Sequence, residues 1–362
     1  MSELFDYKCP NCGGSIQFDS SAQKMKCPYC DSEFDVSALK QMDEVLNKNQ
    51  APDEFKWDNA EKDEWVTTEA ENISVFVCNS CGGEIIGDAN TAATACPYCG
   101  NNVVMSGRLS GVLKPDYVIP FKFDKKAAKE KLKEYIGAKK FAPNTFKSEN
   151  RLNEVKGLYV PVWLFDSDVE AAVQYSATRT RSWSDSKYNY TETSFYDIFR
   201  DGEMQFENIP VDGASKFPDE LMESIEPYDF SEAVDFQTAY LSGYLADKYD
   251  VSMEDSIGRA NTRVKTSAED VLKSTVSGYS SVTVKSSSVN QLSGKSKYAF
   301  YPVWILHTTY QGQSYTFAMN GQTGKFTGNL PVSKAKLAAL FCGSAAIISA
   351  IAYVAGTFLG MF

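Results

Sequence analysis

The sequence predicts a multi-domain protein with two small zinc ribbons, an α+β domain with an antiparallel sheet, and one C-terminal transmembrane helix. Three observations predict it: two four-cysteine blocks near the N-terminal end, alternating apolar residues through the middle, and a charge-free stretch at the C-terminal end. The predicted boundaries are 1–38 for the first ribbon, 39–73 for an acidic linker, 74–106 for the second ribbon, 107–331 for the α+β domain and 332–362 for the transmembrane anchor.

Eight of the nine cysteines form two blocks of the same design. Two residues separate the members of each pair, fourteen residues separate the pairs, and the second block repeats the first after 69 positions. Cys-Gly-Gly and Cys-Pro-Tyr-Cys recur in both blocks, which indicates an internal duplication. The candidate metal ligands are Cys9, Cys12, Cys27 and Cys30 in the first block and Cys78, Cys81, Cys96 and Cys99 in the second.

This spacing is typical of zinc ribbons, because two Cys-x-x-Cys turns joined by a short hairpin surround one metal ion with four thiolates. Each block is too short to support a core of its own, so we expect two structural zinc ions to hold the fold. A catalytic zinc is excluded, since four thiolates leave no open position. Disulfides and a glutaredoxin-like redox role of Cys-Pro-Tyr-Cys are the weaker alternatives, because the pattern is paired and the chain is expected to be cytoplasmic.

The charge distribution favours protein partners over nucleic acid. The net charge is −11, and residues 1–110 hold 18 acidic and 8 basic side chains. A nucleic-acid module would instead show a basic stripe. Phe55, Trp57 and Trp65 interrupt the acidic linker. They are either docking points in a disordered segment or residues that pack onto the ribbons, and the sequence leaves both interpretations open.

Mixed α and β patterns fill residues 107–331. Asp124 is a plausible N-cap for a helix over 125–136, whose lysine-rich face is either solvated or in contact with anionic lipid. Residues 169–183 alternate in polarity, and a polar turn leads into a second antiparallel strand. We further expect a helix over 252–277, and the serine-rich stretch 286–296 reads as a loop.

Two shorter patterns complete this domain. Pro161-Val162-Trp163 is echoed by Pro302-Val303-Trp304, which suggests two related sheet units. The Asn-Gly-Gln-Thr-Gly-Lys stretch that begins at Asn320 lacks the residues of a phosphate-binding loop and predicts a hairpin turn. His307, the single histidine, rules out two-histidine metal sites and lies on a predicted strand, where a structural role is favoured. The sequence therefore offers no catalytic set, and we expect no enzyme.

The C-terminal stretch predicts a membrane anchor. The 26 residues from Leu337 to Phe362 carry no charge, and a helix of that length spans about 39 Å, more than the ~30 Å of hydrocarbon in a bilayer. Lys334 and Lys336 precede it, so the positive-inside rule keeps the bulk of the chain cytoplasmic. A buried core helix is the alternative interpretation. Ala352, Gly356 and Gly360 have the spacing of helix dimers, which is compatible with a homo-oligomer in the membrane.

The order of these features resembles the bacterial TFIIB-type zinc-ribbon-containing membrane proteins of the YdjG-like group. The paired ribbons and the two Pro-Val-Trp segments carry the resemblance. It implies a membrane-associated, non-enzymatic role beside membrane-organising stress proteins, and it brings no catalytic residues. We therefore expect a single-pass protein of the cell membrane that acts as a cytoplasmic adaptor or scaffold for membrane or cytoplasmic proteins. The alternative is a membrane-tethered nucleic-acid binder that uses the lysines of 125–140.

Overall fold

The computed structural model shows a mixed sheet with helices, divided into two compact units that are each discontinuous in sequence. Unit 1 comprises Met1–Ala60, Leu164–Pro210 and Ile257–Ser296, and unit 2 comprises Glu61–Trp163, Val211–Ser256 and Lys297–Phe362. The structure describes residues 8–49, 52–58, 64–65, 73–88, 95–108, 113–147 and 154–358.

The first cysteine block, in unit 1, forms a three-stranded antiparallel sheet followed by a helix. The elements are β1 (Gln17–Asp19), β2 (Lys24–Lys26), β3 (Glu33–Phe34) and α1 (Val36–Asn49), with the strand order β1-β2-β3. Ile16 and Leu39 are buried together with Cys9 and Cys27, and Met25 packs against them. This core is very small, and α1 occupies the start of the segment that the sequence assigned to the linker.

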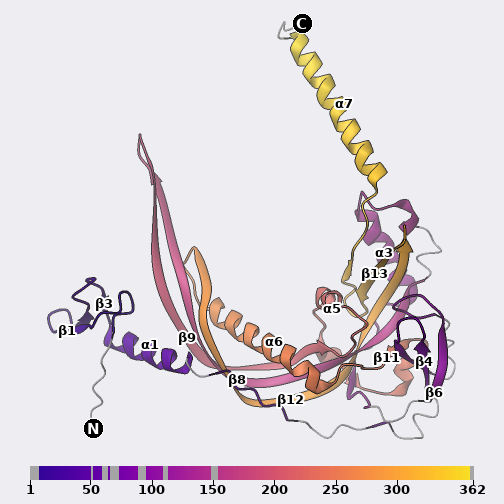
Figure 1. Ribbon diagram of the computed structural model, residues 1–362, viewed down its shortest axis with the longest axis horizontal. Helices are drawn as coiled ribbons and strands as arrows, with labels where there is room; N and C mark the ends of the chain where they lie inside the picture. The colour runs from indigo at the N-terminus through magenta and orange to yellow at the C-terminus, as the bar shows by residue number, and fades with distance from the viewer. Residues whose placement is uncertain are drawn as a thin grey trace. The chain divides into compact units, whose positions relative to one another are not determined.

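The rest of unit 1 is built on long strands and one helix (Figure 1). They are β8 (Lys156–Ser184), β9 (Asn189–Asp212), β12 (Ser281–Tyr310) and α6 (Met253–Ser274), of which β8 and β12 also continue into unit 2. Alternate β8 residues such as Val169 and Val173 pack against Val264 and Ala268 of α6. The predicted strand pair and the predicted helix over 252–277 are therefore confirmed.

The larger sheet has the strand order β10-β7-β12-β8-β11-β5-β4-β6, with β13 and β14 continuing from β12 and β9 pairing with β8, and most of its strands lie in unit 2. Most pairs are antiparallel, but β11 with β8 and β12 with β7 run parallel, so the sheet is mixed. The second cysteine block supplies one end of it. The second cysteine block contributes β4 (Ile73–Cys78), β5 (Glu84–Asp88) and β6 (Val103–Arg108). The remaining strands of unit 2 are β7 (Tyr117–Val118), β10 (Val234–Asp235), β11 (Leu245–Asp247), β13 (Gln313–Asn320) and β14 (Phe326–Gly328).

Helices of unit 2 pack beside this sheet. Asp124 caps α3 as predicted, since its side chain accepts a hydrogen bond from the Ala127 backbone N–H at 2.7 Å. Ala128 and Leu132 of α3 are buried in a cluster with Trp304. The helical elements are α3 (Lys125–Ala138), η1 (Asn144–Lys147), α5 (Asp219–Ile225), η2 (Phe230–Glu232), η3 (Thr238–Leu241) and α7 (Lys334–Phe358).

The turn between β13 and β14 confirms the hairpin prediction and explains its motif. Asn320 is fully buried, and its Oδ1 accepts hydrogen bonds from the backbone N–H groups of Gln322 and Thr323. Its Nδ2 donates to the carbonyl oxygens of Ile225 and Pro227 at 3.0 and 3.2 Å. The motif therefore ties the hairpin to the segment that follows α5.

The serine-rich stretch 286–296 is not a loop, and that prediction is wrong. It lies within β12, where its hydroxyl groups find polar partners in unit 1. Ser286 contacts Gln174 at 3.3 Å, and Ser293 donates to Asp168 at 2.6 Å. Serine has a low strand propensity, but these side-chain partners on β8 outweigh it.

The two tryptophans of the linker pack against other parts of the chain than the cysteine blocks. Trp57 meets Phe165 edge-on, with ring centroids 4.9 Å apart, and its indole N–H donates to Asn261 at 2.8 Å. Trp65 is only 7% exposed, and its indole N–H donates to the Leu113 carbonyl at 3.2 Å. Each tryptophan thus anchors the linker within its own unit.

Helix α7 is the one described helix that is long and apolar enough to cross a membrane. The stretch Lys334–Val354 has a mean hydropathy of 2.1, and none of it is buried. A core helix of a soluble protein would be mostly buried, so the lack of burial of α7 argues against that interpretation. Residues 359–362, which include Gly360 of the small-residue pattern, lie outside the described residues.

Candidate metal centres

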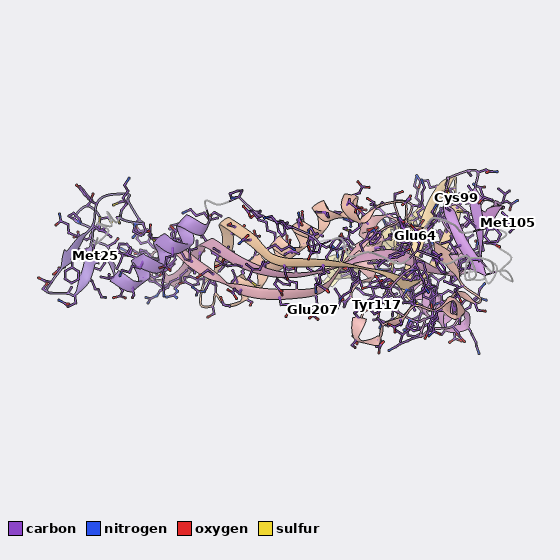
Figure 2. All side chains as sticks on the ribbon, turned by 90° about the horizontal axis from the view of Figure 1, so that it is seen from below. Met25, Glu64, Cys99, Met105, Tyr117 and Glu207 are labelled. Carbon is purple, nitrogen blue, oxygen red and sulfur yellow. The ribbon has the colours of Figure 1, made fainter. Side chains whose placement is uncertain are left out.

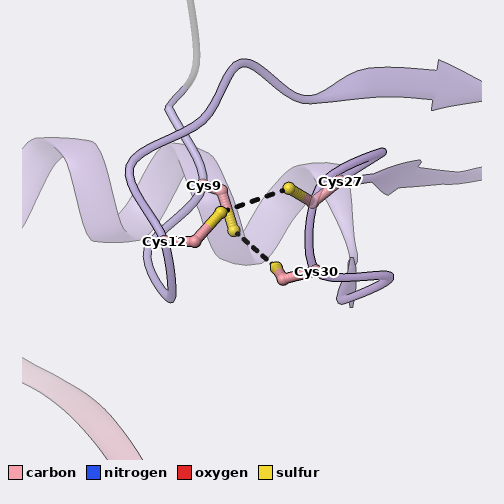
Figure 3. Close-up of side chains that lie close together, drawn as sticks. All are labelled: Cys9, Cys12, Cys27 and Cys30. Carbon is pink, nitrogen blue, oxygen red and sulfur yellow. Dashed lines mark hydrogen bonds between the residues drawn. The ribbon is translucent and has the colours of Figure 1, made fainter.

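The first cluster gathers four sulfur atoms from two turns of the small sheet. Cys9 and Cys12 precede β1, while Cys27 and Cys30 lie between β2 and β3 (Figure 3). The Sγ atoms of Cys9 and Cys30 are 3.5 Å apart, as are those of Cys12 and Cys27. All four sulfur atoms lie within 4.8 Å of one another.

The second cluster repeats this geometry in unit 2. The Sγ atoms of Cys78 and Cys99 are 3.5 Å apart, those of Cys81 and Cys96 are 3.6 Å apart, and all four lie within 4.8 Å of one another. Figure 2 marks Cys99 of this cluster together with Met105 of β6. The structure therefore brings together all eight cysteines that the sequence selected, in two groups of four.

Backbone hydrogen bonds shape each turn. The Gly13 N–H donates to the Cys9 carbonyl at 2.8 Å, and the Gly82 N–H donates to the Cys78 carbonyl at the same distance. Both glycines have a positive φ near +70°, and a side chain there would meet no steric obstacle. Glycine is therefore required for backbone conformation rather than for space.

The sulfur positions fit a four-coordinate metal ion and not a pair of disulfides. Four sulfurs at about 2.3 Å from one zinc ion form a tetrahedron with edges of about 3.8 Å. The observed separations of 3.5 and 3.6 Å are close to that edge. A disulfide requires about 2.05 Å between its sulfur atoms, and all nine cysteines are free thiols. Each cluster could therefore hold one metal ion.

One thiol in each cluster has a lowered pKa. The hydroxyl and the backbone N–H of Ser32 hydrogen-bond the Cys30 sulfur and lower its pKa to about 6. Burial raises the pKa of Cys78, but the backbone N–H groups of Cys81 and Ser80 outweigh it, and the pKa falls to about 7. Thiolates are the form that binds metal, so each cluster offers a ligand that is ionised near neutral pH.

Comparison with known proteins gives one full-length relative. No family model and no solved structure matches the chain. The "Uncharacterized protein YdjG" of Bacillus subtilis (strain 168) is 35% identical over 358 residues, which cover 99% of this chain and 96% of the relative. The chain belongs to the YdjG family. The relative's name assigns no activity, so what this YdjG-family chain does rests on its own residues.

The two clusters of this YdjG-family chain differ in their surroundings. In the first, Cys12 and Cys30 are exposed, and Tyr29 of Cys-Pro-Tyr-Cys is 75% exposed. In the second, the equivalent Tyr98 is half-buried and its hydroxyl donates to Asp247 of β11. Burial raises the pKa of Asp247 to about 8. The duplicated turns are therefore free in one copy and covered by their own chain in the other.

Two basic residues near the second cluster were not foreseen as its neighbours. Lys156 donates to the Ala95 carbonyl at 2.7 Å, and burial lowers its pKa. Lys156 and His307 both line a cavity of about 430 Å³ beside the second cluster. The Nδ1 of His307 contacts the Thr316 hydroxyl at 3.1 Å. Burial lowers the pKa of His307. Only the pairing of β8 and β12 brings these residues to the cluster, so no local pattern could have found them.

Proposed function

We propose that this YdjG-family chain is a cytoplasmic adaptor or scaffold that α7 anchors in the cell membrane and that two structural zinc ions hold in shape. One observation carries the proposal: the two clusters have the same cysteine spacing and geometry, but only the first leaves its Cys-Pro-Tyr-Cys surface largely exposed. The first ribbon is then available to a protein partner, while the second builds the main sheet.

Zinc is the metal that the ligand set favours. Four thiolates with sulfur separations near 3.5 Å suit a tetrahedral d¹⁰ ion, and such sites are structural in zinc ribbons of the TFIIB type. Four occupied positions leave none for water, which supports a non-enzymatic role. In the first ribbon the buried core is too small to fold alone, so zinc would supply much of the folding free energy.

Membrane anchoring is supported by the exposure of α7 and by its attachment to unit 2. Exposed apolar side chains follow the helix for most of its length, among them Leu340, Ile347 and Ile351. At its start, Lys336 donates to the Ala142 carbonyl at 2.6 Å and to Asn144 at 2.8 Å. Lys334 and Lys336 would stay on the cytoplasmic side under the positive-inside rule, as a single-pass protein requires.

The nucleic-acid alternative has less support. Its basic patch is the lysine-rich stretch 125–140, in which Lys131 of α3 lies over the Phe123 ring at 5.0 Å and Lys139, just after α3, lies over the Tyr135 ring at 5.3 Å. These lysines are already engaged with aromatic rings of their own unit. The same engagement weakens the suggestion that this helix face binds lipid headgroups.

Three measurements test the proposal. Purified full-length chain should carry two zinc ions, and a metal assay that finds none, or four disulfides by mass spectrometry, would overturn the zinc assignment. The chain should float with membranes after alkaline extraction, and recovery in the soluble fraction would refute anchoring.

Crosslinking in intact cells should capture a protein partner that Tyr29→Ala loses. The matched Tyr98→Ala variant alters the half-buried copy of the same residue, whose hydroxyl is bound to Asp247, so it should retain the crosslink wherever it folds.

A further inference from the structure

The outer part of the β8–β9 hairpin carries a sheet face that no described residue of unit 1 covers. Alternate β8 residues are buried as far as Ala177, where α6 packs on them, and every residue from Arg179 to Ser184 is exposed. Figure 1 shows the hairpin continuing beyond α6 and beyond the neighbouring part of β12. The same face thus passes from a covered core to an open surface.

Cations and aromatic rings are layered on this open surface. Trp183 and Tyr190 stack with centroids 5.5 Å apart and an angle of 13°, and the Arg181 guanidinium lies 5.5 Å from the Trp183 ring. Arg179 lies over Tyr196 at 5.6 Å and over Tyr279 at 5.4 Å. We call these six residues the hairpin patch: Arg179, Arg181, Trp183, Tyr190, Tyr196 and Tyr279.

The opposite face of the same hairpin has a different character. Thr180 and Thr193 bring their hydroxyl oxygens to 3.5 Å, and Ser182 and Thr191 bring theirs to 3.3 Å. Successive residues of a strand point to opposite faces, so the two arginines and Trp183 of β8 lie on one face and these hydroxyl groups on the other, which also carries the exposed Phe195 of β9. This segregation is typical of an element that lies against a surface.

Asp185 at the tip of the hairpin is ionised but bound within its own turn. Asp185 accepts hydrogen bonds from the backbone N–H groups of Lys187 and Tyr188 and from the Tyr190 hydroxyl, and these bonds lower its pKa. Its carboxylate is therefore used in the turn. In the part of the chain that the structure describes, neither Arg181 nor Lys187 forms an ion pair with Glu192 or any other carboxylate.

We propose that the hairpin patch binds the headgroup layer of an anionic membrane. Trp and Tyr favour that layer because one end of the side chain is apolar and the other polar, and Arg and Lys are attracted by its negative surface potential. The inference rests on the proposed anchoring by α7, which keeps a bilayer within reach of the chain. It assigns the hairpin a second membrane contact, distinct from the spanning helix.

Single-stranded nucleic acid is less well matched to the patch. Base stacking needs an aromatic ring with a free face, but Trp183 is engaged by Tyr190 and by Arg181. The patch therefore presents ring edges and cations rather than open faces. Headgroup phosphates and glycerol carbonyls can be met by such edges.

Tryptophan quenching by brominated lipid tests the inference on the full-length chain. Trp65, Trp163 and Trp304 are buried, Trp57 is half-buried, and Trp183 is 44% exposed. In vesicles of phosphatidylcholine and phosphatidylglycerol with brominated chains, we expect a quenched emission component that Trp183→Phe removes. Arg181→Glu should weaken this component roughly fivefold or more, because each basic residue near an anionic surface strengthens membrane binding by about that factor.

Matched controls separate the outcomes. Lys273→Glu also replaces a positive charge with a negative one, but on the exposed last turn of α6, and it should leave the quenching unchanged. Equal quenching of wild type and Trp183→Phe would overturn the inference. So would quenching of Trp183 by a single-stranded oligonucleotide but not by brominated lipid. A chain that floats with membranes but lacks the component refutes the hairpin contact alone, whereas a chain that does not float refutes the anchoring.

Discussion

Tyr29 and Tyr98 occupy the same place in two identical Cys-Pro-Tyr-Cys turns, but their surroundings are opposite. Tyr98 reaches a carboxylate that lies 149 residues away in sequence, whereas Tyr29 is mostly exposed. The ring of each tyrosine lies against a glycine, Gly14 or Gly83, of the facing turn. The tyrosine is thus part of the turn in both copies, and its outer edge is what the second copy uses for tertiary packing.

Asp247 makes the stability of unit 2 depend on pH. Its folded pKa of about 8 lies above the ordinary value of 3.8 because burial disfavours the charged form. The folded state then holds its proton to higher pH than the unfolded chain, so the free energy of unfolding falls as pH rises from about 4 to about 8. We expect Asp247→Asn to flatten this slope between pH 5.5 and pH 7.5, as measured by urea unfolding followed through tryptophan fluorescence.

Asp185→Asn is the control for that measurement. Its pKa is lowered by hydrogen bonds in the hairpin turn, so its contribution is lost only as pH falls below the ordinary carboxylate range. It should leave the slope between pH 5.5 and pH 7.5 unchanged. An Asp247→Asn variant with the wild-type slope would show that the buried carboxyl does not titrate in this range.

At the scale of elements, the sequence identified the helix and the turn whose conformation is determined by residues close together in the chain. Asp124 indicated the start of α3, and the glycines of the β13–β14 turn indicated the hairpin. The stretch 286–296 was misassigned because its serines read as a loop, while their partners come from β8. The role of Trp57 was hidden for the same reason, since Phe165 lies more than a hundred residues away in sequence.

The packing of α6 on the long strands should be the main support of unit 1. Leu272 is 7% exposed in the cluster that joins α6 to β8, whereas its neighbour Val271 is 45% exposed. Truncation of a buried leucine to alanine costs about 3 kcal/mol, and truncation of an exposed side chain costs less than about 0.5 kcal/mol. We therefore expect Leu272→Ala to lower the unfolding free energy by about 3 kcal/mol.

Val271→Ala is the matched control for Leu272→Ala, one position away on the same helix. Urea unfolding followed through Trp57, which packs in unit 1, gives the readout. Equal losses in the two variants would mean that α6 is not held by this face.

At the scale of the whole molecule, the chain folds into units that no linear segmentation predicts. Composition separates ribbons, linker and anchor along the sequence, but the compact units follow strand pairing. Because β8 and β12 are 29 and 30 residues long, each contributes to both units. The eight cysteines were accessible to sequence analysis because their ligand spacing is local. Their different surroundings were not, because Lys156, Asp247 and His307 arrive from distant strands.

The same division predicts that, if each cluster holds a metal ion as proposed, removal of the two ions has unequal consequences. The first cluster supports a three-stranded sheet with its own small core, whereas the strands of the second continue into the main sheet of unit 2 through β5 and β11. Lys248 and Glu84 also join these two strands at 2.7 Å. Removal of one thiolate should therefore abolish metal binding equally at either cluster but destabilise unit 2 only at the second.

Cys27→Ser and Cys96→Ser make this comparison, with Cys342→Ser as the control outside both clusters. Each cluster variant should carry one zinc ion by elemental analysis, and the control should carry two. Thermal unfolding followed through the buried tryptophans of unit 2 should show a midpoint several degrees lower for Cys96→Ser and little change for Cys27→Ser, because a loss of about 1 kcal/mol already shifts a midpoint by about 2–4 °C. Equal shifts in the two variants would contradict the division, because they would require the first ribbon to support unit 2 as strongly as the second.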